Sequence, residues 1–322
     1  MNLLSLRYRI LGFIAACCCA GSAGAAFPDR PIQIIVPFAA GSTPDLLARL
    51  LGEGWKRSGF AEVVVVNRPG VGGSLGVAQL AKAAPDGYTL AIAGDAALVV
   101  NPALYPDMPL HPLKDLAPVS QLVVTPTVLV VGKEVQARSV AELVALARAN
   151  PGRLSFASAG AGTSSRRNGE LLRQAAQLDL VHVPYQASPL PDVAAGRVTM
   201  FFANAATIAP LLADGRVRPL AVAGRERLTR WPDVPTTAEA GFPQVDSLAW
   251  FGMVAPGGTP PELVERLRDA AAKALQDPAL APRIDALGGA LVVSSPTAFR
   301  ELIGSELPRW RMFVKEAGIK AD

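Results

Sequence analysis

Cysteine and histidine are scarce in this 322-residue chain, which has three of the former and two of the latter. All three cysteines, at positions 17–19, lie in a segment with two arginines, an apolar stretch at residues 10–20 and small residues at its end. This pattern predicts a signal peptide at residues 1–26, and its removal would leave no thiol for a disulfide, a metal site or catalysis. A lipoprotein-like sequence that ends at Cys17 leaves a lipid anchor open as an alternative.

Long runs of one charge are missing too. Removing Arg7 and Arg9 takes the lysines and arginines from 31 to 29, against 27 acids, and no run of five or more like charges occurs. With only four Trp and four Tyr as well, the composition argues against a nucleic-acid groove or a membrane-binding patch. After the signal segment, no window offers the roughly 20 uninterrupted apolar residues that a spanning helix needs.

Catalytic and nucleotide-binding motifs are absent from the sequence. His111 and His182 are expected to be packed or solvent-facing, because a metal site would need carboxylates at suitable spacing. The glycine-rich residues 70–75 do not complete a dinucleotide motif, since the sixth position is Leu75. We therefore expect no enzyme, no metal and no cofactor. A hydrolase or isomerase that uses Asp45 or His182 as a base in the same cleft is the alternative.

A unit that is present occurs four times: a β-branched run, a loop of small residues and a helix start. The strands are expected at residues 32–37, 88–93, 154–157 and 198–202, and their loops at 39–43, 94–96, 158–165 and 203–204. In the first unit, Ser42 and Asp45 have the spacing of a capping box. Leu46, Leu47 and Leu50 then recur with helical periodicity. Alternating strands and helices predict an α/β fold with parallel sheets.

Two apolar runs predict where the chain passes between lobes. The roughly 296 residues after the signal segment would be large for one core, so two lobes are expected. Residues 122–131 and 249–255 are apolar enough to be crossing strands. On this interpretation lobe one comprises residues 27–126 plus 250–322, and lobe two comprises residues 127–249. The double crossover forms a hinge.

The four loops predict an anion site. In parallel sheets, ligands bind beyond the carboxyl ends of the strands, where helix N-termini offer free backbone N–H groups and a positive dipole end. Four or five charge-assisted hydrogen bonds of roughly 1.5 to 3 kcal/mol each suffice for the ~8 kcal/mol of a micromolar complex. One such loop alone would more simply be a turn or a cap. Four loops in register indicate a ligand site that needs no lysine or arginine.

Several motifs are together similar to those of the Bug receptors, the extracytoplasmic solute receptors of tripartite tricarboxylate transporters. The motifs span nearly the whole chain after the signal segment. They lie at residues 31–41, 67–73, 84–89, 101–105, 156–160, 182–185, 233–241 and 250–252.

This resemblance implies a two-lobed type II periplasmic-binding-protein fold that closes on a small organic acid or amino acid. In the family, loops that match residues 38–45, 94–96, 160–164 and 204 hold the ligand. The candidate ligand-binding residues are Phe38, Gly41, Ser42, Thr43, Asp45, Asp95, Ala96, Ala161, Gly162, Thr163, Ser164, Arg166 and Asn204.

The chain departs from the family pattern at a few positions. Ser42 stands where a second glycine is common, and Pro44 where a Thr or Ala is common, which predicts a narrower pocket. Arg166 replaces a frequent His and either faces the cleft, where it favours a second carboxylate, or is a solvated helix residue. Residues 186–192 are expected to form a different wall in lobe two.

These observations predict a monomeric periplasmic receptor that captures a small carboxylate between two lobes. Its expected partners are membrane permease subunits, or a sensor kinase if the protein reports its ligand instead of delivering it. No nucleic acid is expected among them.

Overall fold

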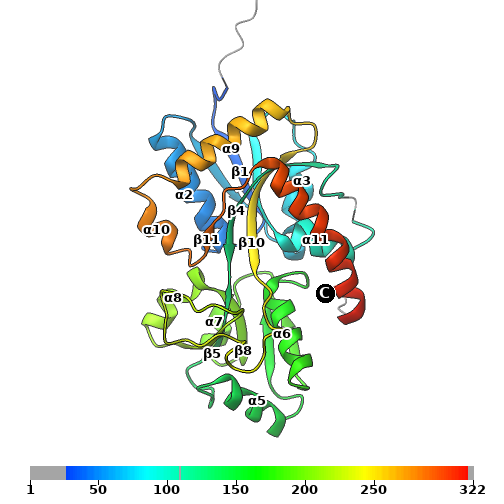
Figure 1. Ribbon diagram of the computed structural model, residues 1–322, viewed down its shortest axis with the longest axis vertical. Helices are drawn as coiled ribbons and strands as arrows, with labels where there is room; N and C mark the ends of the chain where they lie inside the picture. The colour runs from blue at the N-terminus through cyan, green and yellow to red at the C-terminus, as the bar shows by residue number, and fades with distance from the viewer. Residues whose placement is uncertain (1–26, 109, 318–322) are drawn as a thin grey trace, which may run out of the picture.

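The computed structural model describes residues 27–108 and 110–317. The predicted signal peptide, with Cys17, lies outside the described residues. Figure 1 shows two lobes, one above the other, each built on its own β-sheet with helices around it. No helix in the described part of the chain is long and apolar enough to cross a membrane.

The upper lobe has a six-stranded sheet in the order β11-β4-β10-β3-β1-β2. Its strands are β1 (Ile32–Val36), β2 (Val63–Asn67), β3 (Thr89–Gly94), β4 (Leu116–Thr125), β10 (Ala249–Pro256) and β11 (Ala290–Leu291). Its helices are α2 (Thr43–Arg57), η1 (Val71–Gly73), α3 (Ser74–Leu80), η2 (Ala96–Val100), α4 (Asn101–Leu104), α9 (Pro261–Leu275), α10 (Ala281–Asp285) and α11 (Pro296–Ala317).

The lower lobe has a five-stranded sheet in the order β7-β6-β8-β5-β9. Its strands are β5 (Thr127–Gly132), β6 (Ser155–Ser158), β7 (Val181–Pro184), β8 (Met200–Asn204) and β9 (Val217–Val222). Its helices are α5 (Val140–Ala149), α6 (Ser164–Ala175), α7 (Leu190–Ala194) and α8 (Ala205–Ala213).

The predicted α/β fold with two lobes is confirmed, but the sheets are mixed and not parallel throughout. Strand β1 is parallel to β2 and β3, and β6 is parallel to β7 and β8. Strand β10 is antiparallel to both β3 and β4, and β5 is antiparallel to β8 and β9. The expectation of parallel sheets was therefore wrong for the strands next to the crossovers. Strands β5 and β10 begin at the junction between the lobes and run away from it, so each is antiparallel to its neighbours.

The crossover strands lie side by side at the centre of the molecule (Figure 1). Strand β4 ends at Thr125 and β5 begins at Thr127, so one proline separates the two sheets. On the return path, Ala249 pairs with Thr125. We propose to divide the lobes as the sequence indicated, with residues 27–126 and 250–322 in one and residues 127–249 in the other.

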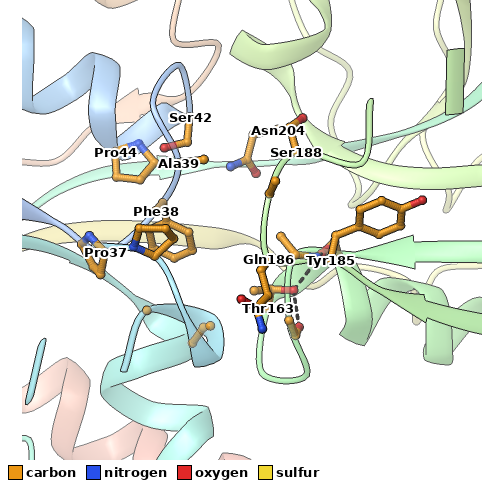
Figure 2. A pocket seen from close by; sticks show the side chains of 18 of the residues that line it. Pro37, Phe38, Ala39, Ser42, Pro44, Thr163, Tyr185, Gln186, Ser188 and Asn204 are labelled. Carbon is orange, nitrogen blue, oxygen red and sulfur yellow. Dashed lines mark hydrogen bonds between the residues drawn. The ribbon is translucent and has the colours of Figure 1, made fainter. Parts of the chain in front are cut away.

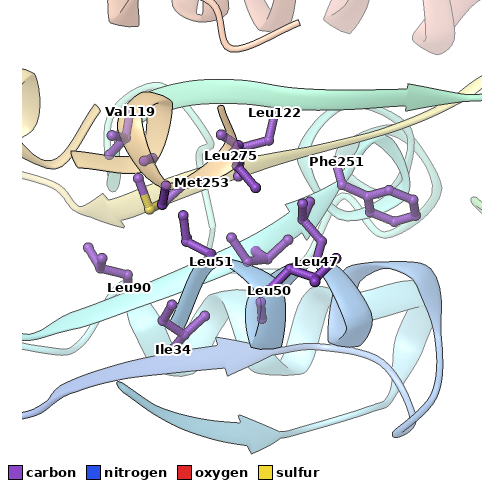
Figure 3. Close-up of a cluster of buried hydrophobic side chains, with 14 of the residues drawn as sticks. Ile34, Leu47, Leu50, Leu51, Leu90, Val119, Leu122, Phe251, Met253 and Leu275 are labelled. Carbon is purple, nitrogen blue, oxygen red and sulfur yellow. The ribbon is translucent and has the colours of Figure 1, made fainter. Parts of the chain in front are cut away.

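Helix α2 is held in the upper lobe by its apolar face. Leu47, Leu51 and Trp55 are fully buried, and Leu50 is nearly so. Figure 3 shows the α2 leucines pointing into a cluster shared with the strands and with Leu275 of α9. Burying side chains of this size stabilises the lobe by about 1.5 to 3 kcal/mol each. This packing fixes the N-terminal end of α2, which reaches the space between the lobes.

Helix α6 of the lower lobe is tied to both crossover segments through Asn168. Its side-chain amide donates to the Thr127 hydroxyl at 2.9 Å and to the Ser247 carbonyl at 2.8 Å. Its Oδ1 accepts from the Ser247 N–H at 2.9 Å. Asn168 has no exposed surface. Water cannot reach its amide, so these hydrogen bonds are the ones that satisfy its polar atoms.

We expect Asn168→Ala to lower the free energy of unfolding by about 2 to 4 kcal/mol, because the buried groups of Thr127 and Ser247 lose their partners. Urea denaturation monitored by circular dichroism measures this loss. Asn150→Ala is the matched control, because Asn150 is half-buried and donates one hydrogen bond to Leu146. Equal losses in the two variants would contradict the role of Asn168 at the junction.

Candidate ligand-binding site between the lobes

A cavity of about 420 Å³ lies between the lobes and is lined by loops from both. Figure 2 shows Phe38, Ala39 and Ser42 of the upper lobe facing Gln186 and Asn204 of the lower lobe. The lining is mainly backbone, small hydroxyl side chains and aromatic rings. Its size is typical of a site for a small molecule.

The loop from Phe38 to Asp45 is shaped by the carboxylate of Asp45. Its Oδ2 accepts from the Gly41 N–H at 2.9 Å, and its Oδ1 accepts from the Asn67 amide at 3.0 Å. Asn67 also donates to the Phe38 carbonyl, and Arg49 donates to both carboxylate oxygens. The carboxylate therefore folds the loop over the start of α2.

This arrangement corrects the capping-box prediction. The Ser42 side chain makes no capping hydrogen bond, and Asp45 bonds to the N–H of Gly41 instead of Ser42. Proline at position 44 has no N–H, and Gly41 has a positive φ of 77°, so the loop turns one residue earlier than in a capping box. The first turn of α2 consequently keeps N–H groups without side-chain partners.

Three helix starts face the cavity without a side-chain cap. The cap residues are Ser42 for α2, Thr163 for α6 and Asn204 for α8, and none of these side chains bonds to the N–H groups of its helix. All three residues line the cavity. Within the described part of the chain, the buried hydroxyls of Ser42 and Thr43 also have no hydrogen-bond partner. These donors can hold an anion from two sides.

The loop before α6 is held open by its own hydroxyl network. Thr163 Oγ1 donates to the Gly160 carbonyl at 2.7 Å and lies 2.7 Å from Ser165 Oγ. Ser165 Oγ in turn accepts from the Ala159 N–H at 3.2 Å. Because these side chains bond to the loop and to each other, the N–H groups at the start of α6 stay available.

Among the described residues that line the cavity, only Asp95 has a charged side chain. It follows β3, and its side chain forms a buried ion pair with Arg167 of α6. Burial raises the pKa of Asp95 above its ordinary value, while the Arg167 charge and hydrogen bonds act in the opposite direction. No cationic side chain lines the cavity within the described residues, so any anion there is held by neutral donors.

Most of the predicted site residues come together around this cavity. Those that line it are Phe38, Gly41, Ser42, Thr43, Asp95, Ala96, Ala161, Thr163, Ser164 and Asn204. Asp45, Gly162 and Arg166 do not line it. Asp45 shapes the loop from behind, as described above.

Arg166 and Gly162 have other roles in the structure. Arg166 forms an ion pair with Glu170 at 2.8 Å and lies over the Phe156 ring, with its side chain only 13% exposed, so it is neither in the cavity nor a solvated residue. At Gly162, a Cβ atom would come within 2.1 Å of Asn101 Oδ1. The missing side chain therefore lets the two lobes approach closely.

Two further segments belong to the cavity wall. One is the glycine-rich segment 69–73, which the sequence marked as part of a family motif but not as part of the site. The other runs from Pro184 to Leu190 and includes Tyr185 and Gln186, and from residue 186 onward a different wall in lobe two was expected. The signal for the first was available, because a glycine run after β2 occupies the same position as the other strand-to-helix loops.

The groups considered as catalytic bases lie outside the cavity lining. His182 Nε2 is 2.7 Å from Ser158 Oγ, and its ring packs against Phe156. Burial and the nearby charge of Arg166 lower the pKa of His182 to about 4, so the ring is neutral near pH 7. The other base candidate, Asp45, is engaged by Arg49 and the Gly41 N–H.

Two lobes joined by paired crossover strands, with a cavity of uncapped helix starts between them, define a solute-binding protein of the periplasmic class. Residues 47–319 match the tripartite tricarboxylate transporter family receptor. The chain belongs to this family, whose members are periplasmic solute-binding receptors.

Individual relatives cover almost the entire chain. Protein BugT of Bordetella pertussis is 36% identical over 99% of both chains. The solved structure of R. palustris Rpa4515 with adipate is 32% identical, covers 91% of this chain and 99% of its own, and has a TM-score of 0.87. That of MatC (Rpa3494) from Rhodopseudomonas palustris with bound malate is 32% identical, covers 89% and 100%, and has a TM-score of 0.83.

We expect Asp45→Asn to lower the free energy of unfolding at neutral pH by about 1.5 to 3 kcal/mol, the contribution of a hydrogen bond to a charged group. Burial alone would raise the pKa of Asp45, but Arg49, the Gly41 N–H and Asn67 outweigh it and hold the pKa below its ordinary value. The stabilisation is therefore present above the ordinary carboxyl pKa and is lost as pH falls through the lowered one.

Urea denaturation of wild type and Asp45→Asn at neutral pH and at about pH 3 measures this effect. The difference between the two proteins should shrink in acid. Asp269→Asn is the control, because Asp269 is an exposed partner of its neighbour Arg268. A difference that stays constant with pH would show that the charge of Asp45 is not the cause.

Proposed function

We propose that this protein is a periplasmic receptor that captures a small carboxylate between its lobes and delivers it to a tripartite tricarboxylate-type transporter. The observation that carries the proposal is the set of uncapped helix starts at Ser42, Thr163 and Asn204 around one cavity. Backbone N–H groups and helix dipoles at these starts favour an anion without a cationic side chain.

The chemistry of the cavity lining also suits a small organic acid. Phe38 and Phe251 pack edge to face with their centroids 6.0 Å apart, and both line the cavity together with Phe202. Polar donors at the loop ends and apolar rings between them suit a carboxylate carried on a short hydrocarbon chain. The adipate and malate bound to the two solved relatives have this character.

Binding by closure follows from the two-sided wall. An anion that bonds to the α2 start of one lobe and to the α6 and α8 starts of the other stabilises the arrangement in which the lobes face each other. A closed, loaded receptor then presents a surface that membrane permease subunits can distinguish from the empty form. This discrimination is what a transporter needs from its receptor.

We expect isothermal titration calorimetry against adipate, malate, other dicarboxylates, monocarboxylates and amino acids to find at least one binder with a Kd of about 1 μM or tighter, equivalent to ~8 kcal/mol. Thermal-shift measurements on the same panel check the result independently. If no carboxylate binds, the proposed function is wrong.

We expect Gly41→Val to weaken binding of the tightest carboxylate at least about tenfold, because a β-branched residue cannot keep the positive φ that places the Gly41 to Thr43 backbone. Gly59→Val is the matched control. Gly59 also has a positive φ and open space around it, but it lies at the other end of α2. Equal losses of affinity in the two variants would count against a ligand-binding role for the Gly41 loop.

A further inference from the structure

Asp95, the one charged side chain among the described residues of the cavity wall, has the wrong sign for a carboxylate receptor. Within the described lining, Asp95 is the charged residue, and it sits beside Ala96 at the start of η2. A free carboxylate at this position would repel a bound anion through a poorly hydrated space, where charge interactions are stronger than in water. The proposed function therefore requires that the charge of Asp95 be neutralised.

The neutralising group comes from the other lobe. Arg167 of α6 has no exposed surface, and its Nη2 donates to Asp95 Oδ2. Its Nε donates to Ser247 Oγ at 2.7 Å and its Nη1 to the Gly162 carbonyl at 2.7 Å. The Leu248 carbonyl accepts a further bond at 3.2 Å.

An aromatic ring completes the surroundings of the guanidinium. The Cζ atom of Arg167 lies 4.3 Å from the centroid of the Trp310 ring of α11. With this ring, one carboxylate and three neutral oxygens around it, the guanidinium is fixed in place without facing the cavity. Arg167 is therefore placed to act on the ligand only through Asp95.

We infer that Arg167 is a specificity-determining residue that masks the charge of Asp95 and so makes the cavity compatible with anions. This inference rests on the proposed function and deepens it. Arg167 is a positioning residue, since it contacts Asp95 and not the ligand. Because the two residues belong to different lobes, Arg167 can compensate the charge of Asp95 only when α6 lies against the end of β3.

The geometry argues against Asp95 as a direct partner for the ammonium group of an amino acid. The carboxylate is bound by Arg167 and also accepts from the backbone N–H of Ala96. An ammonium ion would have to compete with a buried guanidinium that already donates hydrogen bonds from all three of its nitrogens. A carboxylate ligand without an ammonium group is thus the better match to this wall.

The test compares wild type, Arg167→Leu, Asp95→Asn and the double variant in calorimetric titrations with adipate, or with malate if adipate does not bind the wild type. Without Arg167, the pKa of Asp95 rises further, so adipate binds well only when Asp95 takes up a proton. We expect the affinity of Arg167→Leu to fall as pH rises from about 6.5 to about 9, where adipate itself stays fully ionised.

The expected loss for Arg167→Leu at about pH 9 is at least about tenfold. The double variant has no charge at position 95 and should be insensitive to pH over this range. The wild type should depend on pH less than Arg167→Leu does, because Arg167 compensates the charge of Asp95, and its affinity should stay within about threefold of the double variant's. The groups that face Asp95 allow this interpretation. Arg167 is its charged contact, and Ser247 and Leu248 offer neutral oxygens to the same guanidinium. Glu306 of α11 accepts a hydrogen bond from Trp310 Nε1 at 3.3 Å.

Arg173→Leu is the matched control for removing a positive charge from α6. Arg173 pairs with Glu170 at 2.6 Å on the same helix and does not line the cavity. We expect it to change adipate affinity by less than about twofold at every pH, as for other partly exposed ion pairs. Circular dichroism of each variant shows whether it is folded.

If Arg167→Leu does not fold, the inference is tested with Asp95→Asn alone. Asparagine still accepts a hydrogen bond from Arg167 but removes the negative charge, so adipate should bind at least about threefold more tightly than to wild type. Weaker adipate binding in Asp95→Asn would overturn the inference, and so would an Arg167→Leu variant that binds like wild type at every pH. If the wild type binds no carboxylate at all, the proposed function fails instead.

Discussion

The Asp95–Arg167 ion pair joins the two lobes directly, and Asn168, the next residue of α6, holds the segments beside the two crossovers. Asn168 bonds to Thr127 and Ser247, which flank the two crossovers, and Arg167 bonds to Asp95 of the opposite lobe. Both side chains are fully buried, so these bonds are not exchanged with water. This junction lies directly behind the α6 start, which lines the cavity together with the α2 start.

Given that junction, the proposed anion site relies on backbone geometry and not on cationic side chains. The uncapped starts of α2, α6 and α8 supply donors, and the hydroxyl network of the α6 loop keeps some of them free. The Asp45 carboxylate shapes the α2 loop from outside the cavity. Charged residues thus serve as scaffolding around a neutral lining, with Asp95 as the exception that Arg167 offsets.

Much of the fold and site was predictable because the relevant signals are local. Apolar spacing in α2 marked the buried face of Leu47, Leu50 and Leu51, and the four strand-to-helix loops marked most of the lining. Arg166 was harder, because sequence alone does not show that Glu170, one turn later, binds it away from the cavity. Asp95 was identified, but its partner Arg167 was not, since the two are distant in sequence and meet only across the lobes.

The sequence by itself determined the local structures: helix starts, glycine turns and two apolar runs long enough to cross between lobes. Only the tertiary structure decided which groups line the cavity between the lobes and which of these groups are charged. The reason is physical. Periodicity and turn chemistry act over a few residues, whereas burial, ion pairing and the closeness of Gly162 to Asn101 depend on how distant segments pack.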